Sequence, residues 1–405
     1  MPRNPSHSTA ATADRAILVA ADMRGALLPA IESLQELAEL ARTAGAEVVG
    51  TTTQHLHHPH PATYIGKGKV EEVAEARTNL DANVVIFDDE LSPSQQRNLE
   101  KALGVKVIDR TALILDIFAT RAHTAEGRLQ VSLAQMQYLL PRLAGQWSHL
   151  ERMEGAIGTR GPGETQIETD RRLIRSRISR IKRELEDVRT RRSLYRRQRE
   201  RAGIPVVALV GYTNAGKSTL MRTLSGADVL AEDRLFATLD PVTRRLRLPM
   251  GETVLLTDTV GFIQKLPTDL VAAFRATLEE LEEADLLLHV VDIAHPNAFE
   301  HVQTVEATLK DLGVSEKPVL LALNKVDMLT NDDGGRVHDF DEAKAALHGA
   351  GSPPANVVLV SAAKRWGVEL LLARVADALD GRIPTGGETA ALLGRADGHA
   401  SVRAV

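Results

Sequence analysis

One stretch of sequence decides the fold: Gly211-Tyr-Thr-Asn-Ala-Gly216-Lys217-Ser218-Thr219. It follows an unbroken apolar run at residues 204–210, which predicts a strand buried on both faces. An amphipathic stretch through Leu224 comes next and predicts a helix. A strand, a glycine-rich loop and a helix in this order form a phosphate-binding P-loop. We therefore expect a nucleotide-binding α/β domain over residues 203–383.

The P-loop residues have distinct expected roles. Backbone N–H groups turn toward the phosphates, and the helix N-terminus adds positive potential. Lys217 is expected to bridge the β- and γ-phosphates, and the Ser218 hydroxyl is expected to ligate Mg2+. The candidate phosphate contacts are Gly211, Tyr212, Thr213, Asn214, Ala215, Gly216, Lys217, Ser218 and Thr219.

A second motif selects the base. Asn324-Lys325-Val326-Asp327 directly follows the apolar run at residues 319–323. The Asp327 carboxylate can accept hydrogen bonds from guanine N1–H and the 2-amino group, which adenine lacks. Because an unpaired buried carboxylate costs roughly 1–3 kcal/mol or more, adenine is rejected. A third motif follows the apolar run at residues 356–360 and is expected to offer the Ala362 N–H to guanine O6; its candidate contacts are Ser361, Ala362 and Ala363.

Between the P-loop and the base motifs lie two candidate switch segments. Asp258-Thr259-Val260-Gly261 follows a predicted strand at residues 253–257, which places Asp258 to hold Mg2+ through water and Gly261 to meet the γ-phosphate. Thr238, within Phe236-Ala237-Thr238-Leu-Asp240, is expected to complete the metal site in preference to Thr243 and Thr257. Both segments are expected to be ordered only while the γ-phosphate is present. The predicted metal ligands are Ser218, Thr238 and Asp258.

Hydrolysis is expected to be slow. Where Ras-like enzymes carry a glutamine that orients water, this chain carries Phe262, which cannot hydrogen-bond water. Asn214 resembles the asparagine of GTPases in which a bound K+ neutralises developing charge; alternatively, asparagine suits the loop backbone. The candidate catalytic residues are Thr238, Gly261 and Asn214.

The remaining chain divides into recognisable segments. Strand and helix patterns alternate over residues 15–125 and predict a small, mainly parallel α/β domain. Helical patterns at residues 129–153, interrupted near Pro141, and at residues 169–201 predict an antiparallel hairpin over 126–202, with a glycine-rich loop at 155–164. Two tails remain unassigned, at residues 1–14 and at residues 384–405, and the second is expected to be disordered.

Composition sets further limits. The chain has 405 residues, of which 43% are hydrophobic and 25% charged, as in ordinary globular proteins. It has no cysteine, which excludes disulfides and thiolate metal sites. Neither a signal peptide nor an apolar run long enough to span a bilayer is present. We expect a cytoplasmic monomer.

Several motifs outside the nucleotide site are shared with one family. They are Tyr64-Ile-Gly66-Lys67-Gly68-Lys69, Phe87-Asp-Asp-Glu90-Leu-Ser-Pro93, Asp109-Arg110-Thr111 and, most specifically, the whole of residues 155–172. By these motifs the chain resembles HflX, a translation-factor-class GTPase family, over roughly residues 45–380. The resemblance implies binding to the large ribosomal subunit, hydrolysis stimulated by that contact and, in some members, separation of ribosomal subunits under stress.

The charge pattern gives independent support for an RNA partner. Although the net charge is -5, residues 171–201 hold about fourteen basic residues against about four acidic ones. Such a helix can follow RNA phosphates; alternatively, it is a solvated helix whose arginines pair locally with Glu184, Glu186 and Asp187. The glycine-rich loop allows close backbone approach to RNA or simply connects two helices. The RNA-contact candidates are Gly158, Arg160, Gly161, Gly163, Arg171, Arg172 and Arg175.

Two other classes of function remain open. One is a nucleotide-regulated RNA-binding or RNA-remodelling protein, or a ribosome assembly factor, whose N-terminal domain binds ATP or RNA; residues 1–150 contain no second P-loop motif. The other is a GTPase scaffold with the helical hairpin as a protein-docking arm, which the arginine density disfavours.

Overall fold

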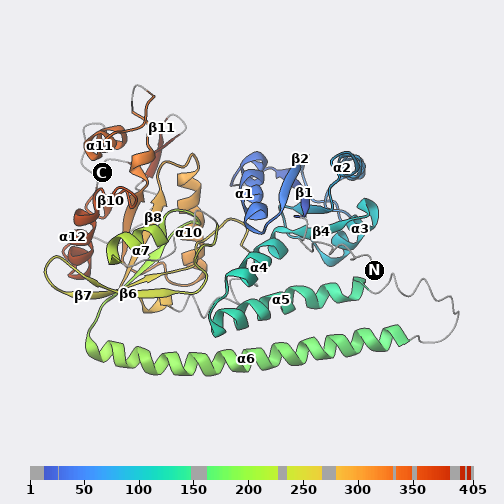
Figure 1. Ribbon diagram of the computed structural model, residues 1–405, viewed down its shortest axis with the longest axis horizontal. Coiled ribbons are helices and arrows are strands. Elements are labelled where there is room, and N and C mark those ends of the chain that lie inside the picture. The colour runs from blue at the N-terminus through green and yellow to red at the C-terminus, as the bar shows by residue number, and fades with distance from the viewer. Residues whose placement is uncertain are drawn as a thin grey trace, which may run out of the picture. The chain divides into compact units, whose positions relative to one another are not determined.

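The computed structural model describes residues 13–25, 27–146, 162–226, 235–266, 280–331, 334–348, 354–383, 393–396 and 399–402 (Figure 1). Its contacts group the chain into two compact units. One consists of Met1–Ile117 with Tyr138–Thr169, and the other of Phe118–Gln137 with Asp170–Val405. Within the described ranges, no helix is both long and apolar enough to cross a membrane.

The first unit contains a four-stranded sheet in the order β2-β1-β3-β4, and all of its strand pairs are parallel. Ile17 and Val19 of β1 lie on the same face as Val85 and Phe87 of β3, where α2 and α3 cover them. This confirms the predicted parallel α/β fold. The elements are β1 (Arg15–Met23), α1 (Ala30–Thr43), β2 (Glu47–Leu56), α2 (Lys67–Asn79), β3 (Val84–Phe87), α3 (Pro93–Leu103), β4 (Lys106–Asp109) and α4 (Arg110–Arg121).

The hairpin helices differ from the prediction in two places. Helix α5 (Ala125–Gln146) continues through Pro141, where an interruption was expected. A proline removes one helical hydrogen bond, but side chains on either side hold this segment: Tyr138 donates to Asp109 Oδ1 over 3.0 Å, and Arg142 donates to the Leu91 carbonyl over 2.7 Å. Helix α6 (Pro162–Ala202) starts before the end of the predicted loop, with proline at a favoured first position.

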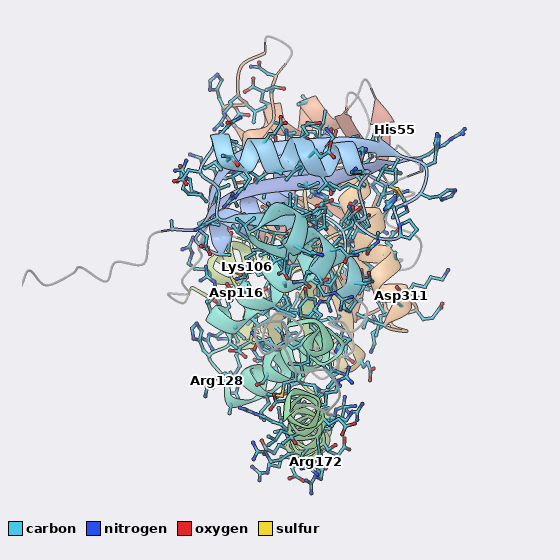
Figure 2. All side chains as sticks on the ribbon, turned by 90° about the vertical axis from the view of Figure 1, so that its right-hand side faces the viewer. His55, Lys106, Asp116, Arg128, Arg172 and Asp311 are labelled. Carbon is cyan, nitrogen blue, oxygen red and sulfur yellow. The ribbon has the colours of Figure 1, made fainter. Side chains whose placement is uncertain are left out.

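In the second unit, the first half of α5 contributes to an apolar cluster with the middle of α6. Leu133, Ile181 and Leu185 are buried in this cluster, and Leu129, Met136 and Ile178 pack around them. The spacing of these residues, three or four positions apart, puts each set on one face of its helix. Most of the other described side chains between residues 168 and 191 of α6 are exposed, and Figure 2 shows the side chain of Arg172 projecting from the helix.

The second unit also contains a six-stranded sheet in the order β10-β9-β8-β5-β7-β6, parallel except for the β6–β7 pair. Helices α7 and α12 cover one face, and α10 and α11 cover the other. This confirms the predicted doubly wound sheet. The elements are β5 (Val206–Val210), α7 (Lys217–Ser225), β6 (Val242–Arg247), β7 (Thr253–Asp258), β8 (Leu286–Asp292), α10 (Ala298–Asp311), β9 (Val319–Asn324), the 3-10 turn η2 (Val326–Met328), α11 (Phe340–His348), β10 (Val357–Leu359) and α12 (Val368–Leu379).

The C-terminal segment was predicted to be disordered, but the structure contains two antiparallel strands there, β11 (Leu393–Ala396) and β12 (His399–Val402). The residues between them in the sequence are Asp397 and Gly398. The tail is rich in glycine and alanine and has no clear core pattern, so the sequence did not indicate these strands.

Candidate functional site

The P-loop connects β5 to α7, and two of its glycines are required by close backbone approach. A Cβ on Gly211 would lie 2.3 Å from the Val290 carbonyl oxygen of β8. A Cβ on Gly216 would lie 2.3 Å from Asn324 Nδ2, and the φ of Gly216 is +93°. Only glycine therefore allows the loop to lie against β8 and the base motif at the same time.

Lys217 begins α7 and is only 6% exposed. Its Nζ donates to the carbonyls of Gly211 over 3.0 Å and of Tyr212 over 2.7 Å. Burial lowers the pKa of the Lys217 ammonium to about 8, although the nearby Asp258 carboxylate favours the charged form. The lysine is thus held inside the loop, next to the predicted phosphate site.

Three oxygen-bearing side chains meet beside Lys217. Asp258 Oδ2 accepts hydrogen bonds from Ser218 Oγ over 2.7 Å and from Thr238 Oγ1 over 2.9 Å, and the two hydroxyls are 2.8 Å apart. Asp258 Oδ1 is buried and has no hydrogen-bond partner among the described residues. A carboxylate and two hydroxyls are hard oxygen ligands of the kind that Mg2+ prefers, so the residues present fit this ion. The alternatives Thr243 and Thr257 instead contact each other over 3.0 Å.

Burial also raises the pKa of the Asp258 carboxyl, because a charge at a 1% exposed position loses its hydration. The positive charge of Lys217 and the hydroxyls of Ser218 and Thr238 oppose this increase. A cation beside Oδ1 would act in the same direction as Lys217 and would favour the ionised carboxylate.

Switch residues are tied to the P-loop through the backbone. The Thr213 N–H donates to the Phe262 carbonyl over 2.7 Å, and the Phe262 N–H donates to the Gly211 carbonyl over 3.1 Å. The Phe262 side chain is 2% exposed and packs inward. A Cβ on Gly261 would lie 2.9 Å from Lys217 Nζ and 2.9 Å from Thr213 Cα, so this glycine also leaves no room for a side chain.

A contact that the sequence analysis missed involves Gln264. Its backbone N–H donates to the Tyr212 hydroxyl over 2.9 Å, which joins the segment after Gly261 to the P-loop. The Tyr212 ring is in turn stacked on His301 of α10, with ring centroids 3.8 Å apart. Burial lowers the pKa of His301 to about 3, so the ring is neutral at physiological pH. Nothing in the spacing of the sequence indicates this stack.

The base motif lies at the carboxyl ends of β9 and β10. Asn324 Nδ2 donates to the Ala215 carbonyl over 2.8 Å, and Lys325 forms a 2.8 Å ion pair with Asp292. Lys325 has a φ of +63°, and Asp327 lies in η2, where it is half-buried. The Ala362 N–H, expected to reach guanine O6, here donates to Asn324 Oδ1 over 3.0 Å. Because a buried N–H group needs a hydrogen-bond acceptor, the Asn324 side chain provides one here.

The remaining motif residues are placed as follows. Ser361 Oγ accepts the Lys364 N–H over 3.0 Å, and Ala363 is exposed. Asn214 is exposed with a φ of +58°, a left-handed conformation that asparagine tolerates without any bound ion. A small cavity of about 50 Å3 unites much of the predicted site; its lining is Thr213, Asn214, Gly216, Lys217, Ser218, Thr219, Phe236, Ala237, Thr238, Thr259 and Gly261.

A larger cavity, of about 360 Å3, lies in the first unit. Its charged lining includes Arg97, Glu100, Lys106 and Asp116, the last two of which are labelled in Figure 2. It has neither a glycine-rich loop nor a helix N-terminus with a buried lysine. The larger cavity therefore lacks the features that predicted the phosphate site.

The RNA-contact candidates are only partly described. Gly158, Arg160 and Gly161 lie outside the described residues, and Gly163 is in the first turn of α6 rather than in a loop. Arg172 and Arg175 are exposed on α6, and Arg171 is half-buried. Of the local pairs weighed above, the described side chains show Arg180 with Glu184 at 3.6 Å and Arg189 with Glu186 at 3.4 Å.

Comparisons with known proteins match GTPases along most of the chain. Three family models match, "GTP-binding GTPase N-terminal" over residues 31–119, "GTP-binding GTPase Middle Region" over 121–199 and "50S ribosome-binding GTPase" over 206–325. GTPase HflX of Caldanaerobacter subterraneus subsp. tengcongensis is 55% identical over 329 residues, which cover 80% of this chain and 77% of the relative. GTPase HflX of Escherichia coli strain K12 is 51% identical over 330 residues, covering 80% and 77%.

A solved structure is also similar. It is a GTP-binding protein from the hyperthermophilic archaeon Sulfolobus solfataricus in complex with GDP, 25% identical, with 91% of this chain and 99% of that chain covered and a TM-score of 0.45.

Proposed function

Because the chain belongs to the HflX family of GTPases, we propose that it is a switch that binds the large ribosomal subunit when GTP is bound and releases it after hydrolysis. As a member of that family it is a GTPase, which converts GTP to GDP and phosphate. The nucleotide dependence, the choice of subunit and the residue roles given below are parts of the proposal.

For the chemistry, we assign the phosphate end of the site to the P-loop and Lys217. Ser218, Thr238 and Asp258 would hold Mg2+, which when bound neutralises charge on the β- and γ-phosphate oxygens. Gly261 offers its N–H to the γ-phosphate. The inward-packed Phe262 supplies no group to order the attacking water, so we expect slow hydrolysis until a partner completes the site.

For the base, we assign guanine recognition to Asp327, which the short η2 turn presents beside the P-loop. Asn324 supports this assignment because its carboxamide contacts both Ala215 and Ala362. Asn324 therefore joins the P-loop to the loop after β10. Binding of the phosphates favours the arrangement of the base loops, and binding of the base favours that of the P-loop.

The observation that carries the ribosome proposal is the surface of α6. Arg172, Arg175 and Arg177 are exposed, and none of them forms an ion pair among the described residues. An array of exposed guanidinium groups along one helix suits the phosphates of folded RNA, where Arg can make bidentate contacts. Local pairing would neutralise this array, and only two such pairs are found in the described part of α6.

Co-sedimentation with purified large and small ribosomal subunits tests the proposal. With a non-hydrolysable GTP analogue we expect binding to the large subunit, and with GDP or no nucleotide we expect at least about tenfold weaker binding. Each arginine that contacts a phosphate should steepen the salt dependence of log K by roughly 0.7–0.9. Equal binding in all nucleotide states, or none, would overturn the proposal.

The matched variants are Arg172→Gln with Arg175→Gln, and Lys344→Gln as a control. The double variant should bind the large subunit more weakly and with a shallower salt slope, while its GTP turnover without ribosomes stays unchanged. Lys344 lies on α11 and pairs with Asp341 over 2.9 Å, so its loss should leave subunit binding unaltered.

Two finer parts of the proposal have their own tests. Separation of stalled ribosomes under stress predicts that the GTP-bound protein converts intact ribosomes into subunits, which light scattering measures directly.

A K+ ion at Asn214 predicts faster GTP turnover in K+ than in Na+. Equal rates would leave the left-handed backbone as the whole reason for the asparagine. RNA-stimulated ATP hydrolysis by the first unit would instead favour an RNA-remodelling function.

A further inference from the structure

Switch residue Thr238 lies between two residues that both reach the corner where α4 ends and α5 begins. The first is Phe236, which is 2% exposed and has a φ of +55°, a conformation that is uncommon for a bulky residue. Its ring packs edge to face on Phe118 in the last turn of α4, with centroids 4.7 Å apart and an interplanar angle of 82°. The strained backbone is thus held by an aromatic contact.

The second anchor is Asp240, two residues after Thr238. Its Oδ2 accepts the backbone N–H groups of His123 and Thr124, each over 2.8 Å, and its Oδ1 accepts the Thr124 hydroxyl. Thr124 also caps α5, because its Oγ1 accepts the Gly127 N–H over 2.9 Å. Asp240 therefore places a carboxylate at the N-terminal end of α5, where the helix dipole and the unpaired N–H groups favour a negative charge.

The fit of Asp240 against α5 is close. A Cβ on Gly127 would lie 2.2 Å from Asp240 Oδ1, so a side chain at this position would displace the Asp240 carboxylate. Both oxygens of the carboxylate have partners from the same short segment. Hydrogen bonds to a carboxylate are shorter and stronger than neutral ones, and these three join the switch segment to the start of α5.

We propose that Asp240 is a positioning residue for GTP hydrolysis, which holds Thr238 at the metal site by clamping the switch segment to the N-terminus of α5. Thr238 contacts Ser218 and Asp258 on one side, and its two anchors contact the α4–α5 corner on the other. Any shift of the start of α5 therefore withdraws the Thr238 hydroxyl from the metal site. By reciprocity, GTP and Mg2+ binding fixes the start of α5.

The proposal rests on the proposed role of Thr238 at the Mg2+ site and is separable from the ribosome proposal, since it concerns turnover of the isolated chain. We would measure kcat, the Mg2+ concentration for half-maximal turnover, and the affinities for a GTP analogue and for GDP. Asp240→Ala and Thr124→Val should each lower kcat about tenfold or more and raise the Mg2+ requirement several-fold. GDP affinity, which needs no switch threonine, should stay within about twofold of the parent chain.

Thr124→Ser keeps the hydroxyl and should retain near-parental kcat and Mg2+ requirement. His123→Ala is the matched control, since His123 donates through its backbone and its exposed side chain takes no part in the clamp. Because Asp240 and Thr124 act through one contact, the double variant should be no slower than the slower single variant.

Three results would overturn the proposal. One is that kcat and the Mg2+ requirement both stay within twofold of the parent chain in Asp240→Ala and in Thr124→Val. Another is a loss of GDP affinity and of melting temperature as large as the loss of kcat, which would mean a structural role only. The third is that the two substitutions act independently, so that kcat of the double variant falls by the product of the two single effects.

Discussion

The Ala362 backbone N–H donates to Oδ1 of Asn324 over 3.0 Å, and the same carboxamide donates through Nδ2 to the Ala215 carbonyl over 2.8 Å. Asn324 is 2% exposed and Ala215 is 1% exposed, so both hydrogen bonds are shielded from water. One asparagine thus connects the end of β9, the P-loop and the loop after β10. This joins the segments that we propose to bind the base and the phosphates in one hydrogen-bonded unit.

Replacing Asn324 should weaken binding of GTP and GDP alike. Asn324→Ala leaves a buried N–H and a buried carbonyl without partners, at roughly 1–3 kcal/mol each. We expect at least a tenfold loss of affinity for both nucleotides, measured by fluorescent-nucleotide titration. Asn331→Ala removes a carboxamide that contacts Glu342 over 2.8 Å away from these loops and should change affinity less than twofold; an equal loss in both variants would contradict the assignment.

Gly261 should discriminate GTP from GDP. A methyl group in Gly261→Ala would meet Lys217 Nζ and Thr213 Cα, each 2.9 Å from the added carbon. Lys217 must then shift, and the segment that we propose to face the γ-phosphate is displaced. We expect at least a tenfold loss of GTP-analogue affinity with a smaller loss for GDP, measured by isothermal titration.

The control for Gly261 is Gly68→Ala, because nothing lies within 4 Å of a Cβ there and the residue is in helix α2. That change should leave GTP and GDP binding as in the parent chain, because the added methyl group meets no neighbouring atom. Unaltered GTP binding in Gly261→Ala would show that the segment does not approach the γ-phosphate.

Asp327 should determine which base is accepted. In Asp327→Asn an amide group replaces one carboxylate oxygen, so it can no longer accept two hydrogen bonds from guanine. Xanthine carries an oxygen where guanine has its 2-amino group, and the amide can donate to that oxygen. We expect GTP turnover to fall and xanthosine triphosphate turnover to rise when the two are compared in competition; an unchanged preference for GTP would remove Asp327 from the base site.

The pattern of the sequence was sufficient for the fold class and for most strands of the two sheets, although β6 and β8 were not predicted. Apolar runs before Gly211, Asp258 and Asn324 predicted β5, β7 and β9, and parallel strands bring their carboxyl ends to one edge. For this reason Ser218 and Asp258, far apart in the chain, could be grouped before any geometry was known, whereas Thr238 was chosen from its switch motif. Their contacts in the structure are those expected of neighbours at such an edge.

Contacts that cross between unrelated segments could not be predicted in this way. Asp240 stood inside a switch motif with no assigned role, and its partners Thr124 and His123 lie more than a hundred positions earlier. Nor does spacing reveal that the Tyr212 ring stacks on His301. Pro141 was a misleading signal, because tertiary hydrogen bonds at Tyr138 and Arg142 outweigh the loss of one helical bond.

Acid should destabilise the second unit through His289. This residue lies in β8, is 1% exposed, and has an Nδ1 atom without a hydrogen-bond partner among the described residues. Burial, aided by the charge of Lys217, lowers its pKa from 6.5 to about 3. The unfolded chain therefore binds more protons between these values, and stability falls as the pH drops below 6.5.

The free energy of unfolding should be about 1.4 kcal/mol lower at pH 5.5 than at a pH well above 6.5. The free energy of unfolding, measured with urea, should fall between pH 7.5 and pH 5.5. In His289→Leu this fall should be smaller than in the parent chain by about 1.4 kcal/mol. His58→Leu changes an exposed histidine and should leave the difference as it is. An identical pH dependence in all three chains would mean that His289 is not the responsible group.

We propose that this GTPase hydrolyses GTP slowly until it binds the ribosome, because the inward-packed Phe262 provides no group to order water. The most direct test is steady-state GTP turnover of the purified chain with and without large ribosomal subunits, with small subunits as the control. We expect slow turnover alone, at least a tenfold increase with the large subunit, and no increase with the small one. A turnover that the large subunit leaves unchanged would contradict the account.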